Sequence, residues 1–143
     1  MNAITNSRPA AVSILIVEDD KVAGKMLGRI IAQELSDVII NIAEDGEQGV
    51  ELFKAHLPDI VITDINMSVM DGIQMAMEIK SVKADTRFIV LTGYSDQRYM
   101  EMFNEIGVND YIVKPIDFVK LFAALEKCIG ELNNNPSDGA NIN

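Results

Sequence analysis

Short apolar runs alternate with longer segments of helical spacing along most of the chain. Runs rich in β-branched and other large apolar residues predict strands at 12–17, 38–42, 60–62, 87–92 and 109–113. Between and after these runs, apolar residues recur every three to four positions, which predicts five helices. Strict alternation of strands and helices favours a parallel sheet that is covered on both faces. We therefore expect an α/β fold, a doubly wound five-stranded parallel sheet.

The limits and faces of the helices follow from the same spacing. The first helix has a stripe of apolar residues, namely Val22, Met26, Leu27, Ile30, Ile31 and Leu35. The second follows Asp45-Gly46 and ends before Pro58, and the third carries Ile73, Met77 and Ile79. The fourth runs from about residue 96 to 106 with Gly107 as its C-terminal stop. Asp117 is the predicted N-cap of the last helix, whose buried face is Phe118, Leu121, Phe122, Leu125 and Ile129.

Length and composition indicate one globular domain over residues 12–132. The chain has 143 residues, of which 48% are hydrophobic and 24% charged. Residues 1–11 are expected to form a flexible leader, and the polar, turn-rich residues 133–143 a disordered tail or the start of a linker. No apolar run approaches the roughly 20 residues of a membrane helix. The single cysteine, Cys128, excludes an internal disulfide and fits a cytoplasmic protein.

Charged and hydroxyl side chains follow several of the predicted strands. The first strand is followed by Glu18 and Asp19, the third by Asp64, the fourth ends in Thr92 and the fifth is followed by Lys114. Because parallel strands end at one edge of a sheet, these groups should meet there. Clustered acids repel one another and call for a cation, and oxygen ligands without Cys or His favour Mg²⁺. The net charge of −10 disfavours nucleic-acid binding through phosphates.

Several short motifs, in order along the chain, together resemble the receiver domain of two-component response regulators. The resemblance covers roughly residues 12–132, and it rests on Val17-Glu18-Asp19-Asp20, Thr63-Asp64, Met70-Asp71-Gly72, Leu91-Thr92-Gly93 and Tyr111-Ile112-Val113-Lys114-Pro115. It implies a flavodoxin-like sheet of order 2-1-3-4-5. It also implies that a sensor histidine kinase, or a phosphotransfer protein, passes a phosphoryl group to Asp64.

The resemblance assigns a role to each residue near the phosphoryl group. Asp64 would attack phosphorus and form an acyl phosphate. Mg²⁺ would be held by Asp19, Asp64 and the backbone carbonyl of Asn66, with Glu18 acting through a coordinated water. Lys114 would pair with a phosphate oxygen, and Pro115 would follow it through a cis peptide bond that turns the lysine inward.

The resemblance also implies a conformational switch. Thr92 would donate its hydroxyl to the phosphate, and Tyr111 would turn into the space that Thr92 vacates. The output surface would then comprise the fourth helix, the fifth strand and the fifth helix, where an unknown output protein or domain would bind. The protein would be a monomer or a phosphorylation-dependent dimer that contacts neither membrane nor nucleic acid.

Each residue also has an ordinary structural interpretation, and other function classes compete. Taken singly, Asp19 or Asp20 could cap a helix, Thr92 could end a strand and Tyr111 could be core. A hydrolase or phosphotransferase with an aspartyl nucleophile is disfavoured, because Asn66 stands where a second acid would be expected. A flavodoxin-like cofactor binder is disfavoured because no Gly-rich loop follows the first strand. An inactive receiver that acts by contact alone stays open.

Three positions depart from the family pattern or tune it. Ser68 stands where the family commonly has proline, so the loop after Asp64 could be more mobile. Asn66 and Tyr94 occupy the positions that tune the attack of water on the acyl phosphate, and their combination does not yield a lifetime. The sequence leaves open whether the chain is a stand-alone receiver or a piece of a longer regulator or hybrid kinase.

Overall fold

The computed structural model describes residues 11–65, 67, 72–93 and 97–133. Expectations that involve Asn66, Ser68 or Tyr94, the Met70-Asp71 part of one motif, and the two ends of the chain lie outside these residues. Within the described part, none of the helices has the length and apolar character needed to cross a lipid bilayer.

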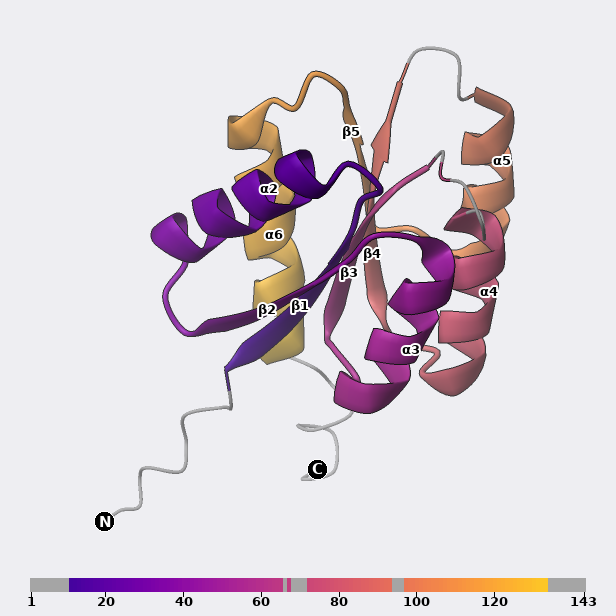
Figure 1. Ribbon diagram of the computed structural model, residues 1–143, viewed down its shortest axis with the longest axis horizontal. Helices are drawn as coiled ribbons and strands as arrows, with labels where there is room; N and C mark the ends of the chain where they lie inside the picture. The colour runs from indigo at the N-terminus through magenta and orange to yellow at the C-terminus, as the bar shows by residue number, and fades with distance from the viewer. Residues whose placement is uncertain (1–10, 66, 68–71, 94–96, 134–143) are drawn as a thin grey trace.

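The five strands form a single parallel sheet in the order β2-β1-β3-β4-β5 (Figure 1). Their bounds are β1 Val12–Val17, β2 Val38–Ala43, β3 Ile60–Asp64, β4 Arg87–Thr92 and β5 Asp110–Val113. The predicted doubly wound α/β fold and its strand order are confirmed. β3 runs two residues further than its apolar core, so that Asp64 is the last residue of the strand.

Five helices alternate with the strands, and several begin at aspartates that cap them. The helices are α2 Lys21–Glu34, α3 Gly46–His56, α4 Gly72–Val82, α5 Gln97–Ile106 and α6 Phe118–Asn133. The side chains of Asp20 and Asp45 accept backbone N–H groups at the starts of α2 and α3, and Asp117 does so at the start of α6. Gly107 follows α5 with a φ of 109°, so the predicted C-terminal stop and the predicted Asp117 cap are confirmed.

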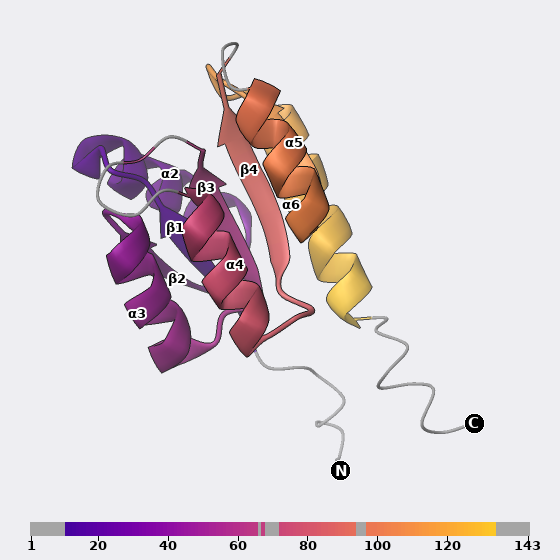
Figure 2. The same ribbon diagram turned by 90° about the vertical axis from the view of Figure 1, so that its right-hand side faces the viewer.

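Two hydrophobic cores fill the space between the sheet and its helices. Helices α3, α4 and α5 cover one face and α2 and α6 the other (Figures 1 and 2). Alternate residues of the central strands point to opposite cores, so that Val61 packs under α3–α5, whereas Ile60 and Ile62 pack under α2 and α6. Both faces of β3 are therefore buried, which holds Asp64 on a rigid element.

The predicted apolar faces of three helices need correction. Val22 and Met26 of α2 are exposed by 70% and 57%, Met77 of α4 by 57%, and Phe118 at the start of α6 by 38%. Leu27 and Ile31 of the predicted stripe are buried, and Gly24 and Gly28 complete the buried face of α2.

The glycines decide which side of α2 meets the sheet. A Cβ added to Gly24 or Gly28 would lie 3.2 or 3.1 Å from the side chain of Ile42 in β2. The helix backbone therefore packs directly against the sheet at these two positions. A search for large apolar side chains cannot detect this contact, because glycine carries no side chain.

Candidate functional site

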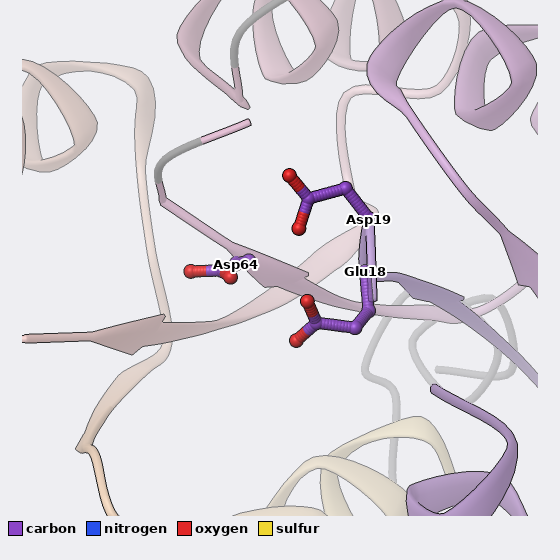
Figure 3. A group of neighbouring side chains, drawn as sticks. All are labelled: Glu18, Asp19 and Asp64. Carbon is purple, nitrogen blue, oxygen red and sulfur yellow. The ribbon is translucent and has the colours of Figure 1, made fainter. Parts of the chain in front are cut away.

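The carboxylates of Glu18, Asp19 and Asp64 gather at the carboxyl ends of β1 and β3 (Figure 3). One oxygen from each lies within 4.8 Å of the others. Glu18 and Asp64 are buried and Asp19 is exposed, so the cluster opens to solvent on the side of Asp19. The parallel sheet explains this convergence, because neighbouring β1 and β3 end at the same edge.

Lys114, which directly follows the edge strand β5, completes the cluster. Its Nζ donates to Oδ2 of Asp64 at 2.7 Å and lies 3.7 Å from Oε1 of Glu18. Burial alone would lower the pKa of Lys114, but its hydrogen bond to Asp64 and the charges of Asp64, Glu18 and Asp19 outweigh burial and raise it. The lysine therefore stays charged and faces the acids.

The environment of Glu18 differs from that of an exposed carboxyl. Burial, together with the negative charge of Asp64, raises the pKa of Glu18, although a hydrogen bond from the Asp20 N–H and the charge of Lys114 oppose the shift. The side chain of Asp20, by contrast, accepts the N–H groups of Val22 and Ala23 and caps α2. Asp20, the third of the consecutive acids after β1, is therefore the N-cap of α2.

Asp64 is held in a fixed orientation by its own strand and by Lys114. The residue is 7% exposed. Its Oδ1 accepts a hydrogen bond from the Ile65 N–H at 2.8 Å, and its Oδ2 accepts one from Nζ of Lys114. The Ile65 N–H in turn also donates to the carbonyl oxygen of Leu91 in β4 at 3.1 Å. One buried carboxylate therefore presents its oxygens at the sheet edge beside two further acids.

Thr92 and Lys114 lie side by side at the ends of β4 and β5. The Lys114 N–H donates to the Thr92 carbonyl at 2.7 Å, and Thr92 pairs with Val113 in the ladder. Thr92 is buried, and its hydroxyl donates to the carbonyl of Gly93 at 3.2 Å. The Lys114–Pro115 peptide bond is cis, as the resemblance implied.

Tyr111 lies on β5 and extends toward α5. Its hydroxyl is within hydrogen-bond distance of the Met100 carbonyl (3.0 Å) and of Oδ1 of Asn104 (2.6 Å). Burial raises the pKa of this phenol. Sequence reasoning did not single out Asn104, because an exposed asparagine in a helix carries no signal by itself. Only the packing of α5 against the end of the sheet places it beside Tyr111.

Comparison with known proteins identifies the family. Residues 14–126 match the family model of the response regulator receiver domain. The chain is a receiver domain. Receiver domains act in two-component signalling, and accepting a phosphoryl group is the function of the family. The chemotaxis protein CheY of Bacillus subtilis is 35% identical over 116 residues, which cover 81% of this receiver and 96% of CheY.

The chain is also similar to a solved structure and to a longer regulatory protein. In the solved structure of the N-terminal domain of an uncharacterized protein from Wolinella succinogenes, the match has 38% identity and a TM-score of 0.77, and it covers 84% of this chain and 95% of that one. The uncharacterized transcriptional regulatory protein YesN of Bacillus subtilis is 32% identical over 120 residues, which cover 83% of this chain. The match covers only 33% of YesN.

The donor set of the site suits a hard divalent cation. Receiver domains bind Mg²⁺ at an acidic pocket, and here three carboxylates present oxygens close enough to share one ion. No sulfur or imidazole ligand belongs to this cluster of described residues, so its donors favour hard cations over softer metals. The Asn66 carbonyl, which the sequence suggested as a further ligand, lies outside the described residues.

Proposed function

We propose that Asp64 is the phosphoacceptor of this receiver and that it takes its phosphoryl group from a phosphohistidine of a sensor kinase or phosphotransfer protein. The observation that carries the proposal is the convergence of Lys114, Glu18 and Asp19 on the buried carboxylate of Asp64. An aspartate that only capped a helix or ended a strand would not need three charged neighbours from two other strand ends. The proposal therefore rests on this arrangement rather than on the position of Asp64 alone.

The transfer step divides the work among the charged groups. A carboxylate oxygen of Asp64 forms a bond to phosphorus while the bond from phosphorus to the histidine nitrogen breaks, and the electron pair stays on the imidazole. Lys114, which pairs with Oδ2 of the free carboxylate, can move its hydrogen bond to a phosphoryl oxygen. Glu18, Asp19 and Asp64 would hold Mg²⁺, which supplies positive charge beside the transferred group.

Charge balance explains why the lysine and a metal are both needed. The acyl phosphate carries about −1.5 to −2 charge in place of the single negative charge of the free carboxylate, so the site becomes more negative by up to about one charge. The cluster already holds three carboxylates against one ammonium, so the added charge would be strongly repelled without a divalent cation. The metal therefore favours the phosphorylated form over the free carboxylate, and removal of Mg²⁺ should block the modification.

We propose that Thr92 and Tyr111 convert the modification into a change of surface. Thr92 ends the strand beside β3, so a short shift brings its hydroxyl to a phosphoryl oxygen. Tyr111 lies on the next strand, paired with Val90, and links β5 to α5 through its hydroxyl. The output surface would comprise α5, β5 and α6, and phosphate would bias two packings of these elements.

The protein is proposed to be a switch rather than a turnover enzyme. Family membership supports a phosphoacceptor role, and no second acid stands at the position two residues after Asp64, where the sequence has Asn66. Any self-dephosphorylation would then be slow compared with the turnover of a dedicated hydrolase. The proposed partners are a sensor kinase or phosphotransfer protein and an output protein or domain. The protein itself would be a monomer or a phosphorylation-dependent dimer.

Beryllofluoride, which mimics the acyl phosphate, tests the proposal with Mg²⁺ and the full chain. In ¹H–¹⁵N NMR spectra we expect amide shifts at the site and across α5, β5 and α6. Asp64→Asn should abolish all of them, whereas Thr92→Ala should keep the site shifts and weaken those of α5 and α6. Equal shifts in wild type and Asp64→Asn would refute the assignment of Asp64. Full shifts of α5 and α6 in Thr92→Ala would refute the coupling route.

A further inference from the structure

The hydroxyl of Tyr111 is held by one turn of α5. Its oxygen lies 2.6 Å from Oδ1 of Asn104 and 3.0 Å from the carbonyl oxygen of Met100. These two acceptors are four residues apart in α5, so they face the same side of the helix. Tyr111 is half-buried, and its ring packs against the core under α3, α4 and α5. The hydroxyl of Tyr111 therefore joins β5 to α5.

Chemistry allows both contacts to be made at once. A phenol has one proton to donate, so it cannot donate to both the Met100 carbonyl and the Asn104 oxygen. Rotating the Asn104 side-chain amide by a half-turn exchanges its oxygen and its NH₂ group. In that orientation the NH₂ group points at the phenol oxygen. Tyr111 would then donate to Met100 and accept from Asn104. We call this pair of contacts the Tyr111 clasp.

The clasp occurs together with the direct hydrogen bond between Lys114 and the Asp64 carboxylate. In the same structure Lys114, three residues after Tyr111, donates to Oδ2 of Asp64. The Lys114 N–H also binds the Thr92 carbonyl, so β5 is tied to the site at one end and to α5 through Tyr111. A conformation in which Tyr111 leaves α5 must break the clasp, whereas the conformation in which Lys114 pairs with the Asp64 carboxylate keeps it.

We infer that Asn104 is a positioning residue that sets the resting balance of the switch, by holding Tyr111 on α5 while Asp64 is unmodified. This inference rests on the proposed function, since it names what opposes the movement of Tyr111. A contact made in only one of two conformations shifts their equilibrium by its full differential strength. Loss of the Asn104 contact should therefore favour the conformation that phosphorylation stabilises.

Three variants of α5 test the inference by beryllofluoride binding in Mg²⁺. One net hydrogen bond corresponds to a factor of about five in an equilibrium constant, so Asn104→Ala should tighten the apparent Kd by up to about fivefold. Asn104→Asp removes the NH₂ donor and leaves only acceptor oxygens, so the phenol proton can serve Met100 or residue 104 but not both, and the apparent Kd should lie between those of wild type and Asn104→Ala. The matched control is Glu105→Ala, an exposed neighbour on the same helix, which should change nothing.

A thermodynamic cycle with Tyr111→Phe separates the clasp from a general effect on α5. Phenylalanine keeps the ring and removes the hydroxyl, so Asn104→Ala should have no further effect on the Kd in that background. Without beryllofluoride, the ring resonances of Tyr111 should shift in Asn104→Ala and stay unchanged in Glu105→Ala. A merely structural role of Asn104 in α5 would persist in the phenylalanine background.

The outcomes separate this inference from the proposed function. An unchanged or weakened affinity in Asn104→Ala, or an effect that survives Tyr111→Phe, would overturn the role of Asn104 and leave Asp64 as the phosphoacceptor. Failure of wild type to bind beryllofluoride at Asp64 would overturn the proposed function and the inference with it. Tighter binding that vanishes in Tyr111→Phe would support both.

Discussion

Lys114 and Asp64 are fifty positions apart in the sequence, yet their charged atoms lie 2.7 Å apart at the edge of the sheet. The side chain of Asp64 is 10% exposed and that of Lys114 is 37% exposed. The pair is therefore partly shielded from solvent, and Glu18 lies on the other side of the same ammonium group. Lys114 thus offsets the repulsion between two acids from neighbouring strands.

Replacement of Lys114 by methionine should destabilise the protein. The change leaves the carboxylates without their ammonium partner, and a half-buried pair of this kind lies between the exposed and buried limits, at about 1–2 kcal/mol in the free energy of unfolding. Lys21→Met is the control, because Lys21 and Glu44 form an exposed pair at 3.7 Å and its loss should cost under about 0.5 kcal/mol. Urea unfolding in EDTA measures both, and equal losses would contradict the expectation.

Mg²⁺ should stabilise the folded protein through the acidic cluster. A ligand that binds only the native state, at a hundred times its Kd, adds about 2.7 kcal/mol to the free energy of unfolding. Asp19→Asn should remove most of this gain, and Glu51→Gln, an exposed acid on α3, should retain it. Thermal unfolding in MgCl₂ and in NaCl of matched ionic strength gives the comparison. A similar gain in Asp19→Asn would place the ion elsewhere.

Two glycines should respond in opposite directions to alanine. A Cβ at Gly72 would lie 3.1 Å from the Asp64 carbonyl and 3.2 Å from the Phe103 ring, so Gly72→Ala should destabilise by about 1–3 kcal/mol. A Cβ at Gly130 in α6 would meet nothing within 4 Å, so Gly130→Ala should stabilise by about 0.5–1 kcal/mol. Chemical denaturation of the two variants checks the signs. Stabilisation by Gly72→Ala would show that the start of α4 has room to move.

Alkaline pH should destabilise the protein partly through Cys128. Burial raises the pKa of this thiol to about 11, above the value of 9.0 for a free thiol. The folded state then holds the thiol proton more tightly than the unfolded state. The contribution of the thiol to the free energy of unfolding is therefore complete below pH 9 and is lost as the pH rises through about 11. Cys128→Ala should show a shallower decline of unfolding free energy across this range. Equal slopes of unfolding free energy against pH in the two proteins would contradict a raised pKa of the Cys128 thiol.

The sequence predicts the fold and the meeting of the charged groups because both depend on strand ends. Buried strands of β-branched residues are easily located, and a parallel sheet brings their carboxyl ends to one edge. This reasoning brings Asp64 and Lys114 together although neither is near the other in sequence. It also explains why the expected cluster of Glu18, Asp19 and Asp64 is found at that edge.

Features that depend on how a helix is turned against the sheet could not be predicted in this way. Periodicity marks an apolar stripe, but α2 buries Gly24 and Gly28 and exposes Val22 and Met26. At the start of α6, Phe118 has the spacing of the buried face yet is 38% exposed. Asn104 was missed for the same reason, since its contact with Tyr111 depends on the position of α5.

Chemical mapping of the acyl phosphate tests most directly whether Asp64 accepts the phosphoryl group. The full chain would be incubated with acetyl phosphate and Mg²⁺, reduced with borohydride, which converts an aspartyl phosphate to homoserine, and digested for mass spectrometry. We predict homoserine at position 64 and at no other aspartate, with none when EDTA replaces Mg²⁺. Homoserine at another aspartate, or none in the presence of Mg²⁺, would contradict the assignment.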